Sequence, residues 1–337
     1  MNYKHFIGID VSKKWLDFAI VEQNQIVFNL QTENSKAGIQ SFIKQVKREK
    51  SIEIELSVCC MEHTGIYNNH ALEYLHKKKA NIWLESGFQI KQSSGLQRGK
   101  NDKVDAQRIA LYAYKNREEI KLWKPKREVV QQLKHLTTLR SRLINVSKQI
   151  KTPLKEIQGF MSKKIINQTE RLSRNTLKSV VKDLKAVERE IHIIIEADPE
   201  LNRLFNIITS ITGIGAITAS EIIVSTNEFN DITCAKKFAC YSGVAPFEYQ
   251  SGSSIRGKTR VSQMGNKTIK TLLHLSALTA VSYNPELKTY YQRKVEEGKN
   301  KMSILNAVRN KLIHRIFACV RQNRMYEKKY TFSLVNP

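Results

Sequence analysis

The sequence predicts an α/β domain with a mixed sheet at the N-terminus, followed by an all-α region. Three changes of pattern along the 337 residues carry this prediction. Short apolar runs alternate with amphipathic runs in the first third, and apolar residues recur every seven positions in the middle. Helical periodicity returns in the last third around one glycine- and serine-rich loop. We therefore expect three domains, at residues 1–125, 126–200 and 201–330.

Five apolar runs of strand length, each bounded by turn residues, predict the strands of the sheet. They cover residues 5–11, 15–21, 25–30, 54–61 and 81–84. Tight turns join the first three into a β-meander, whereas residues 54–61 are apolar enough for burial on both faces. Helices are expected at residues 37–49 and 70–79, and this order of strands and helices indicates a mixed sheet.

The middle of the chain carries two heptad series. Val129, Leu136, Leu143 and Ile150 form the first, and Leu177, Leu184 and Ile191 form the second. Two long helices follow, most simply as an antiparallel coiled-coil arm or an oligomerisation element. The alternative is two amphipathic helices packed on a globular core. Six shorter helices are expected after them, at residues 201–208, 216–224, 234–241, 267–281, 285–297 and 301–323.

The charge of the chain points to a polyanionic partner. Lysine and arginine outnumber aspartate and glutamate 56 to 31, which gives a net charge of +25. Beyond Ile255 the chain has 17 lysine and arginine residues but only 4 aspartate and glutamate residues. Because such an excess attracts phosphate, nucleic acid is the expected partner.

Cysteine usage and hydropathy exclude other classes of protein. The five cysteines form no C-x-x-C pair, so we expect neither a disulfide framework nor a zinc site. No apolar run is long enough for a signal-peptide core or a membrane span. A reducing cytoplasm and the absence of a membrane partner are therefore expected.

Four carboxylates are placed where they could share a metal. KNDKVDAQRIA, residues 100–110, puts Asp102 and Asp105 on one face of a predicted helix start. Asp10 and Glu62 each stand at the end of an apolar strand. Converging on one sheet edge, they would suit Mg²⁺, and two ions about 4 Å apart would clamp the oxygens of a phosphodiester. Taken singly, the aspartates could instead be a helix N-cap, a first-turn residue and a turn former.

Three segments resemble the acidic motifs of the DEDD-type insertion-sequence transposases with a RuvC-like N-terminal domain, a family known as RNA-guided bridge recombinases. They are GIDVSKKWLDFAIV at residues 8–21, MEHTGIY at 61–67, and KNDKVDAQRIA. Further segments resemble the family's C-terminal transposase domain in the same order. They are ITGIGAITASEII from Ile211, FACYSGVAPFEYQSGSSIRGKTRVSQMGNKTIK at 238–270, and the Asn284-Pro285 helix followed by Gly298-Lys299. The resemblance covers nearly the whole chain.

This resemblance implies an RNase H-like (RuvC-like) N-terminal fold, a coiled-coil arm and a helical C-terminal domain with a catalytic serine. It also implies that the serine attacks DNA to give a covalent phosphoserine, assisted by an acidic tetrad with Mg²⁺, as two ions, or Mn²⁺. Matching the motifs assigns Asp10, Glu62, Asp102 and Asp105 to the catalytic and metal-binding tetrad and Ser251 to the nucleophile. Ser253 and Ser254 leave the last assignment open. His63 departs from the family's small residue and receives no catalytic role.

The resemblance further implies the partners. Family members assemble as homodimers and homotetramers on a structured non-coding guide RNA that pairs with donor and target DNA. Two subunits could contribute the halves of one active site. A cytoplasmic, nucleoid-associated location in a prokaryote is expected.

The serine loop contains residues suited to binding phosphate. Gly252 and Gly257 allow close approach of the backbone, whereas a flexible polar turn would read similarly. No histidine lies near Ser251, so a histidine base would need His274 or a distant residue, and a metal or an aspartate is the more economical activator. The expected nucleic-acid-binding residues are Lys100, Lys103, Arg108, Gly213, Gly215, Gly252, Arg256, Lys258, Arg260, Lys267 and Lys270.

Gly213 and Gly215 resemble the hairpin of helix-hairpin-helix modules, whose backbone amides bind DNA phosphate. Tight helix packing is the alternative role for these glycines. Two alternatives to a recombinase also remain. One is a RuvC-like metal-dependent nuclease that resolves branched DNA with water as the nucleophile, and the other is a non-enzymatic RNA-binding scaffold.

Overall fold

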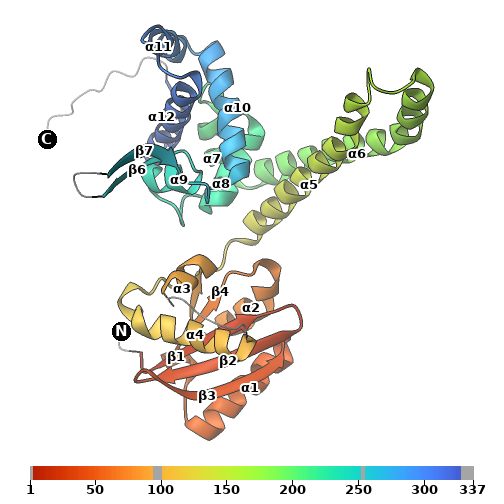
Figure 1. Ribbon diagram of the computed structural model, residues 1–337. Helices are drawn as coiled ribbons and strands as arrows, with labels where there is room; N and C mark the ends of the chain where they lie inside the picture. Colours follow the sequence, from red (N-terminus) through yellow and green to blue (C-terminus); the bar gives the residue numbers. More distant parts are fainter. Residues whose placement is uncertain (1–2, 94–100, 252–254, 328–337) are drawn as a thin grey trace, which may run out of the picture. The chain divides into compact units, whose positions relative to one another are not determined.

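The computed structural model describes residues 3–93, 101–251 and 255–327. Within these ranges it leaves out the side chains of Tyr249, Ser251, Ile255, Arg256 and Lys258. The chain divides into two compact units, Met1–Pro125 and Lys126–Pro337, and each is described by itself (Figure 1).

The first unit is built on a five-stranded mixed sheet, as the sequence predicts. Its strands are β1 (His5–Val11), β2 (Trp15–Glu22), β3 (Gln25–Glu33), β4 (Val58–Glu62) and β5 (Asn81–Glu85). Their order in the sheet is β3-β2-β1-β4-β5. The first three strands pair antiparallel as a meander, while β4 and β5 run parallel to β1. Because β1 and β4 are parallel neighbours, their carboxyl ends lie at the same edge.

Helices cover both faces of this sheet (Figure 1). On one face, α1 (Lys36–Lys50) and α2 (Asn69–Lys77) bury their apolar stripes against the side chains of alternate strand residues, including Ile7 and Ile9. On the other face, α3 (Gly87–Ser93) and α4 (Asp102–Lys115) pack on the intervening residues such as Phe6. The period of two in the strands therefore builds two cores, one on each side.

The contact between α4 and β1 depends on a glycine. A Cβ atom at Gly8 would lie 2.2 Å from the carbonyl oxygen of Ala106 and 2.3 Å from the amide nitrogen of Ala110. Side chains never approach helix backbone this closely, so any residue larger than glycine would push α4 away from the strand. The close approach places the first turn of α4 beside the end of β1, where Asp10 lies.

One predicted strand starts later than expected. Residues 54–56 form a short 3₁₀ helix, η1 (Ile54–Leu56), and β4 begins at Val58. The Ser57 amide donates to the Ile54 carbonyl and the Ser57 hydroxyl to the Glu53 carbonyl, at 2.8 Å. These local hydrogen bonds stabilise a turn, which the run of apolar residues at 54–61 does not indicate.

In its described residues, 126–251 and 255–327, the second unit consists of helices and one hairpin. Two long helices, α5 (Glu128–Glu156) and α6 (Lys163–Ala197), lie side by side (Figure 1). They coincide with the heptad segments. The heptad residue Ile191 and its neighbour Val187 are buried near the base of the pair, whereas Val146 of α5 is 40% and Leu172 of α6 70% exposed. The two helices are thus confirmed, while their role as a coiled coil stays a prediction.

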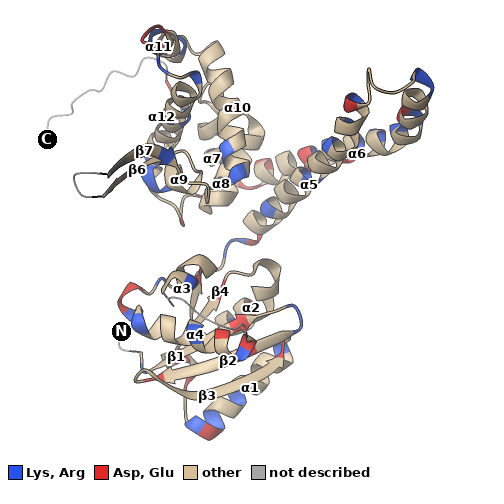
Figure 2. Ribbon diagram, viewed as in Figure 1, with Lys and Arg blue, Asp and Glu red and all other residues tan. Residues whose placement is uncertain are grey.

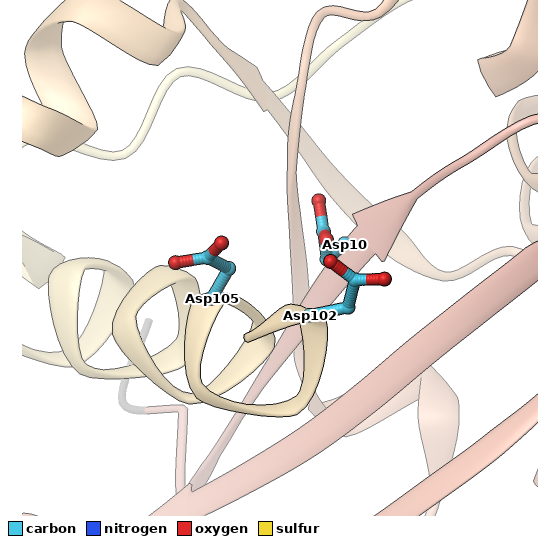
Figure 3. A group of neighbouring side chains, drawn as sticks. All are labelled: Asp10, Asp102 and Asp105. Atoms are coloured by element: carbon cyan, nitrogen blue, oxygen red, sulfur yellow. The ribbon is translucent and has the colours of Figure 1, made fainter. Parts of the chain in front are cut away.

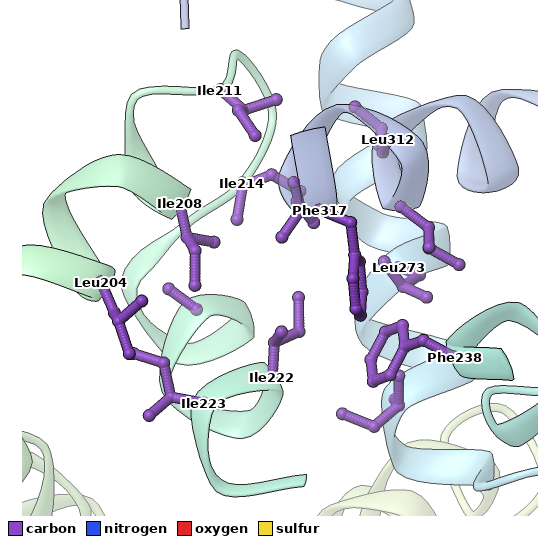
Figure 4. Close-up of a cluster of buried hydrophobic side chains, with 14 of the residues drawn as sticks. Leu204, Ile208, Ile211, Ile214, Ile222, Ile223, Phe238, Leu273, Leu312 and Phe317 are labelled. Carbon is purple, nitrogen blue, oxygen red and sulfur yellow. The ribbon is translucent and has the colours of Figure 1, made fainter. Parts of the chain in front are cut away.

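Six helices follow, close to the predicted ranges. They are α7 (Pro199–Thr209), α8 (Ala216–Thr226), α9 (Ala235–Tyr241), α10 (Lys267–Tyr283), α11 (Pro285–Glu296) and α12 (Lys301–Arg321). Their apolar faces meet in one core, with Ile222, Phe238, Leu273 and Phe317 among its buried side chains (Figure 4). None of the described helices is both long and apolar enough to cross a membrane.

The predicted serine loop is part of a β-hairpin, which the sequence analysis did not anticipate. Strands β6 (Pro246–Ser251) and β7 (Ile255–Val261) pair antiparallel, with Phe247 opposite Arg260. The hairpin interrupts the run of helices between α9 and α10. Its strands are rich in polar residues, so they lack the apolar alternation that marks a half-buried strand.

Candidate metal and DNA-processing site

Asp10, Asp102 and Asp105 meet in the first unit (Figure 3). One carboxylate oxygen from each lies within 4.8 Å of the other two. Asp10 comes from the end of β1, and the other two come from the first turn of α4. The N-cap of α4 is Asn101, whose side chain accepts a hydrogen bond from the Lys103 amide at 3.1 Å. Asp102 is therefore not needed as a cap, and that simpler interpretation of it is wrong.

The electrostatics of this cluster favour a bound cation. Partial burial, followed by the charges of Asp102, Asp105, Asp17 and Glu62, raises the pKa of Asp10 to about 6. Among the described residues, Arg108 is the one basic side chain that forms an ion pair with the cluster, at 2.7 Å from Asp105. A divalent cation would remove the repulsion between the remaining carboxylates. The oxygen donors match the preference of hard divalent ions, so the residues fit such a metal.

Glu62 lies at the same edge of the sheet but outside this three-carboxylate group. It directly follows Met61, which pairs with Ile9 in the parallel register, so Glu62 and Asp10 leave neighbouring strands together. Its carboxylate rests against Gly87, where an added Cβ would lie 1.9 Å from Oε1. Glu62 also contributes to the raised pKa of Asp10. The structure thus gathers three of the four predicted acids and places the fourth nearby.

Asp17 is a carboxylate beside the site that the sequence analysis missed. It stands directly opposite Asp10 in the β1–β2 ladder, and its side chain is buried. The Gln31 side-chain amide donates to both Asp17 oxygens at 3.1 Å. Burial raises the pKa of Asp17. The signal was present in the sequence, because a tight turn between two strands places residues 10 and 17 opposite each other.

The basic residues predicted around the acids differ in their surroundings. Lys103 is exposed on the first turn of α4. The Arg108 guanidinium is half-buried and bound to Asp105, so it orients that carboxylate. Lys100 lies outside the described residues. His63 is exposed, and its ring nitrogen accepts from the Gly65 amide at 3.3 Å, which leaves it a local role in the turn.

The second unit carries the predicted serine. Ser251 is the last residue of β6 and pairs with Ile255 of β7. Gly257 and Arg260 are exposed positions on β7. Gly252, Ser253 and Ser254 lie outside the described residues, as do the side chains of Ser251, Arg256 and Lys258.

Lysine and arginine positions are frequent near this hairpin, on α9 and at the start of α10 (blue in Figure 2). Lys267 is exposed in the first turn of α10, and Lys270 is half-buried one turn later. Both residues were predicted to bind nucleic acid. Their position suits contact with a phosphate backbone close to the hairpin.

Gly213 and Gly215 precede α8 in different environments. Gly213 has φ +99°, and a Cβ there would lie 2.6 Å from the Ser276 carbonyl oxygen on α10. Tight packing therefore accounts for Gly213. Gly215 is the N-cap of α8, with no atom within 4 Å of an added Cβ. Its open surroundings leave room for a phosphate at the start of the helix.

Comparison with known proteins gives two matching family models. A model of DEDD transposases of the IS110 type, described as "Transposase", matches residues 7–158. A second model, described as "Transposase IS116/IS110/IS902 family", matches residues 205–292. The two follow one another in the order of the acidic and serine motifs.

Curated relatives agree with these matches. The pilin gene-inverting protein of Moraxella bovis is 27% identical over 331 residues, covering 97% of this chain and 98% of the relative. That of Moraxella lacunata is also 27% identical, over 332 residues and with the same shares. The insertion element IS110 uncharacterized 43.6 kDa protein of Streptomyces coelicolor is 30% identical over 155 residues, 46% of this chain and 37% of the relative.

One solved structure is "T. thermophilus RuvC in complex with Holliday junction substrate". Its alignment covers 36% of this chain and 100% of the RuvC chain. The identity is 14% and the TM-score is 0.29, which is too low to support a conclusion. The two family models and the curated relatives do support a conclusion about the family of this chain. The chain belongs to the DEDD transposases of the IS110 family, which are enzymes that act on DNA.

Proposed function

We propose that the chain is the site-specific recombinase of an insertion sequence, which cleaves and exchanges DNA strands through a phosphoserine intermediate. The observation that carries this proposal is the meeting of Asp10, Asp102 and Asp105 within 4.8 Å, from segments more than 90 residues apart. Carboxylates held this close repel one another, which, after burial, contributes to the raised pKa of Asp10. A shared divalent cation would remove this repulsion.

Asp10, Glu62, Asp102 and Asp105 would hold Mg²⁺, as two ions, or Mn²⁺. When bound, such ions polarise a phosphodiester and stabilise the charge on its attacking and leaving oxygens. The chain's own residues prepare this site. Gly8 lets α4 lie against β1. The ion pair with Arg108 fixes the orientation of Asp105. The Gln31 amide holds the side chain of Asp17, which lies opposite Asp10 in the ladder.

Ser251 would supply the nucleophile from the second unit. Its hydroxyl oxygen forms a bond to phosphorus, the bond from phosphorus to the leaving deoxyribose oxygen breaks, and the serine proton passes by way of a carboxylate to that leaving oxygen. One strand end is then esterified to Ser251, and the other carries a free hydroxyl. A hydroxyl from the second strand reverses the same step and completes the exchange. Arg260, Lys267 and Lys270, near the hairpin, would neutralise the phosphate charge.

We extend the proposal to the partners. A structured non-coding guide RNA would pair with donor and target DNA, and the net charge of +25 suits a protein that carries two nucleic acids. The long helices α5 and α6 would join subunits into a homodimer or homotetramer. The acids and the serine belong to different units, so an active site assembled from two subunits is compatible with the chain. A cytoplasmic, nucleoid-associated prokaryotic protein fits this role.

A metal-dependent nuclease acting through water is the second candidate. The carboxylate cluster alone supports it equally well, because such a cluster can also activate water. It differs in needing no serine and in leaving no covalent product. The third alternative, a scaffold without enzymatic activity, has no support in a family of DNA enzymes.

The deciding experiment traps the covalent intermediate. The protein is incubated with the DNA ends of its element, the cognate RNA and Mg²⁺, and is then run on a denaturing gel. We expect a protein–DNA adduct with the wild type and with Ser253→Ala and Ser254→Ala, and none with Ser251→Ala or Asp102→Ala. DNA cleavage by Ser251→Ala without an adduct would establish the water-dependent nuclease instead.

A further inference from the structure

A shallow cavity at the base of the β6–β7 hairpin has no role in the chemistry described so far. It has a volume of about 560 Å³ and is lined by Cys240, Tyr241, Phe247, Ser262, Met264, Gly265 and Asn266. Large apolar side chains surround it, although they face solvent: Tyr241 is 40%, Phe247 50% and Met264 68% exposed. Exposed apolar groups that cluster in a hollow indicate a binding site.

The cavity has a fixed frame. A Cβ at Gly265 would lie 2.4 Å from the Gly243 Cα, so the loop before α10 rests directly on the turn after α9. The Asn266 amide donates to the Tyr241 carbonyl at 2.8 Å, and the Asn266 side chain donates to the Tyr241 hydroxyl at 3.0 Å. These bonds hold the tyrosine ring in place. The apolar surface is therefore presented ready for a ligand.

The charges around the cavity select the kind of ligand. Lys236 and Lys237 are exposed one turn before Tyr241 on α9, and Lys267 follows Asn266. Arg260 stands opposite Phe247 in the hairpin, where cross-strand neighbours project to the same face. None of these four cations forms an ion pair within the described part of the chain. Glu248, next to Phe247 at a register shift in the ladder, is the one acidic residue of the two strands. The rim is positive, and the floor is aromatic.

We propose that this cavity binds an unpaired nucleobase of the DNA strand being processed, stacked on Tyr241 and Phe247. Aromatic side chains within a cationic groove are the general means by which proteins hold single-stranded bases. Strand exchange requires bases to leave their duplex, and a base that has left the stack needs an apolar surface. The inference rests on the proposed recombinase function, because the cavity lies at the base of the hairpin whose first strand ends at Ser251.

The test uses the full-length protein and a single-stranded DNA oligonucleotide that contains 2-aminopurine, in EDTA so that no strand is cut. Stacking on the aromatic floor should quench the fluorescence of the base. We expect Tyr241→Ala and Phe247→Ala to lose most of the quenching and to bind the oligonucleotide about tenfold more weakly. Tyr241→Phe keeps the ring and should retain both signals.

Phe160→Ala is the matched control, because it removes another exposed aromatic side chain from the same unit. It should bind like the wild type, and all variants should bind a blunt DNA duplex equally well. Unfolding temperatures check that each variant folds. The proposal is overturned if the two alanine variants bind the single strand normally, if they lose duplex binding to the same extent, or if the loss occurs only with an RNA oligonucleotide. If this quenching is seen but the separate gel experiment with Mg²⁺ yields no Ser251 adduct, the serine mechanism is contradicted and this site still stands.

Discussion

Asp10 is a carboxyl group held among other carboxyl groups, and this has a consequence for stability. Its pKa is raised to about 6, mainly by burial and then by Asp102 and Asp105. An unfolded aspartate loses its proton near pH 4, so the metal-free folded state is penalised as the pH rises from about 4 to 6. The penalty is complete at about one pH unit above this pKa and absent at low pH.

We therefore expect Asp10→Asn to stabilise the protein in EDTA at pH 7.5. Two pKa units would correspond to almost 3 kcal/mol, and solvent screening at this partly exposed site reduces the expected gain to about 1–2 kcal/mol. The gain should disappear near pH 4. Chemical unfolding at the two pH values measures it, with Glu73→Gln on the exposed surface of α2 as the control without a gain. Equal stabilisation at both pH values would show that carboxylate repulsion is not the cause.

The positions of acidic residues in the sequence predicted much of the carboxylate cluster. Acids at the ends of apolar strands are costly unless they emerge into a site, and this argument identified Asp10 and Glu62. Asp17 escaped the same argument because it lies within β2, and its importance depends on its partner across the ladder. The Arg108–Asp105 ion pair also escaped it, since helical spacing permits such a pair without requiring it.

At the level of elements, the packing of α4 on β1 positions the acids. Gly8→Ala would place a methyl group 2.2 Å from the Ala106 carbonyl oxygen, so α4 would have to move. We expect a loss of about 2 kcal/mol in stability, together with weaker binding of Mn²⁺, because Asp102 and Asp105 move with the helix. Thermal unfolding and calorimetric titration with Mn²⁺ measure the two effects.

Gly215→Ala is the control for that substitution. Its added Cβ meets no atom within 4 Å, and its φ of −93° suits alanine. It should lower stability only by the small cost of alanine at an N-cap, less than Gly8→Ala, and leave Mn²⁺ binding unchanged. If Gly8→Ala behaves in the same way, α4 does not depend on the close approach to β1.

Helices and strands were predictable where their apolar period was regular. The meander, the two long helices and the six C-terminal helices follow from period alone. The β6–β7 hairpin was not predictable in this way, because its polar strands are stabilised by pairing with each other rather than by a buried face. The 3₁₀ turn at Ile54–Leu56 depends on the Ser57 hydrogen bonds, which an apolar run conceals.

At the scale of the whole molecule, the proposed chemistry is divided between two units. The carboxylate cluster belongs to Met1–Pro125, whereas Ser251 and the nucleobase cavity belong to Lys126–Pro337. The family-model matches are divided similarly, into residues 7–158 and 205–292. The sequence could predict the contents of each unit from motifs and period. It could not predict whether one chain or two supply the proposed halves of the site, because that depends on surfaces between chains.

The central claim is that acids remote in sequence hold a divalent cation, and a crystal grown with Mn²⁺ tests it most directly. The account predicts an anomalous-scattering peak about 2 Å from carboxylate oxygens of Asp10 and Asp102. The peak should be absent from Asp102→Asn crystals. Wild-type crystals with saturating Mn²⁺ and no peak between these two side chains would contradict the account.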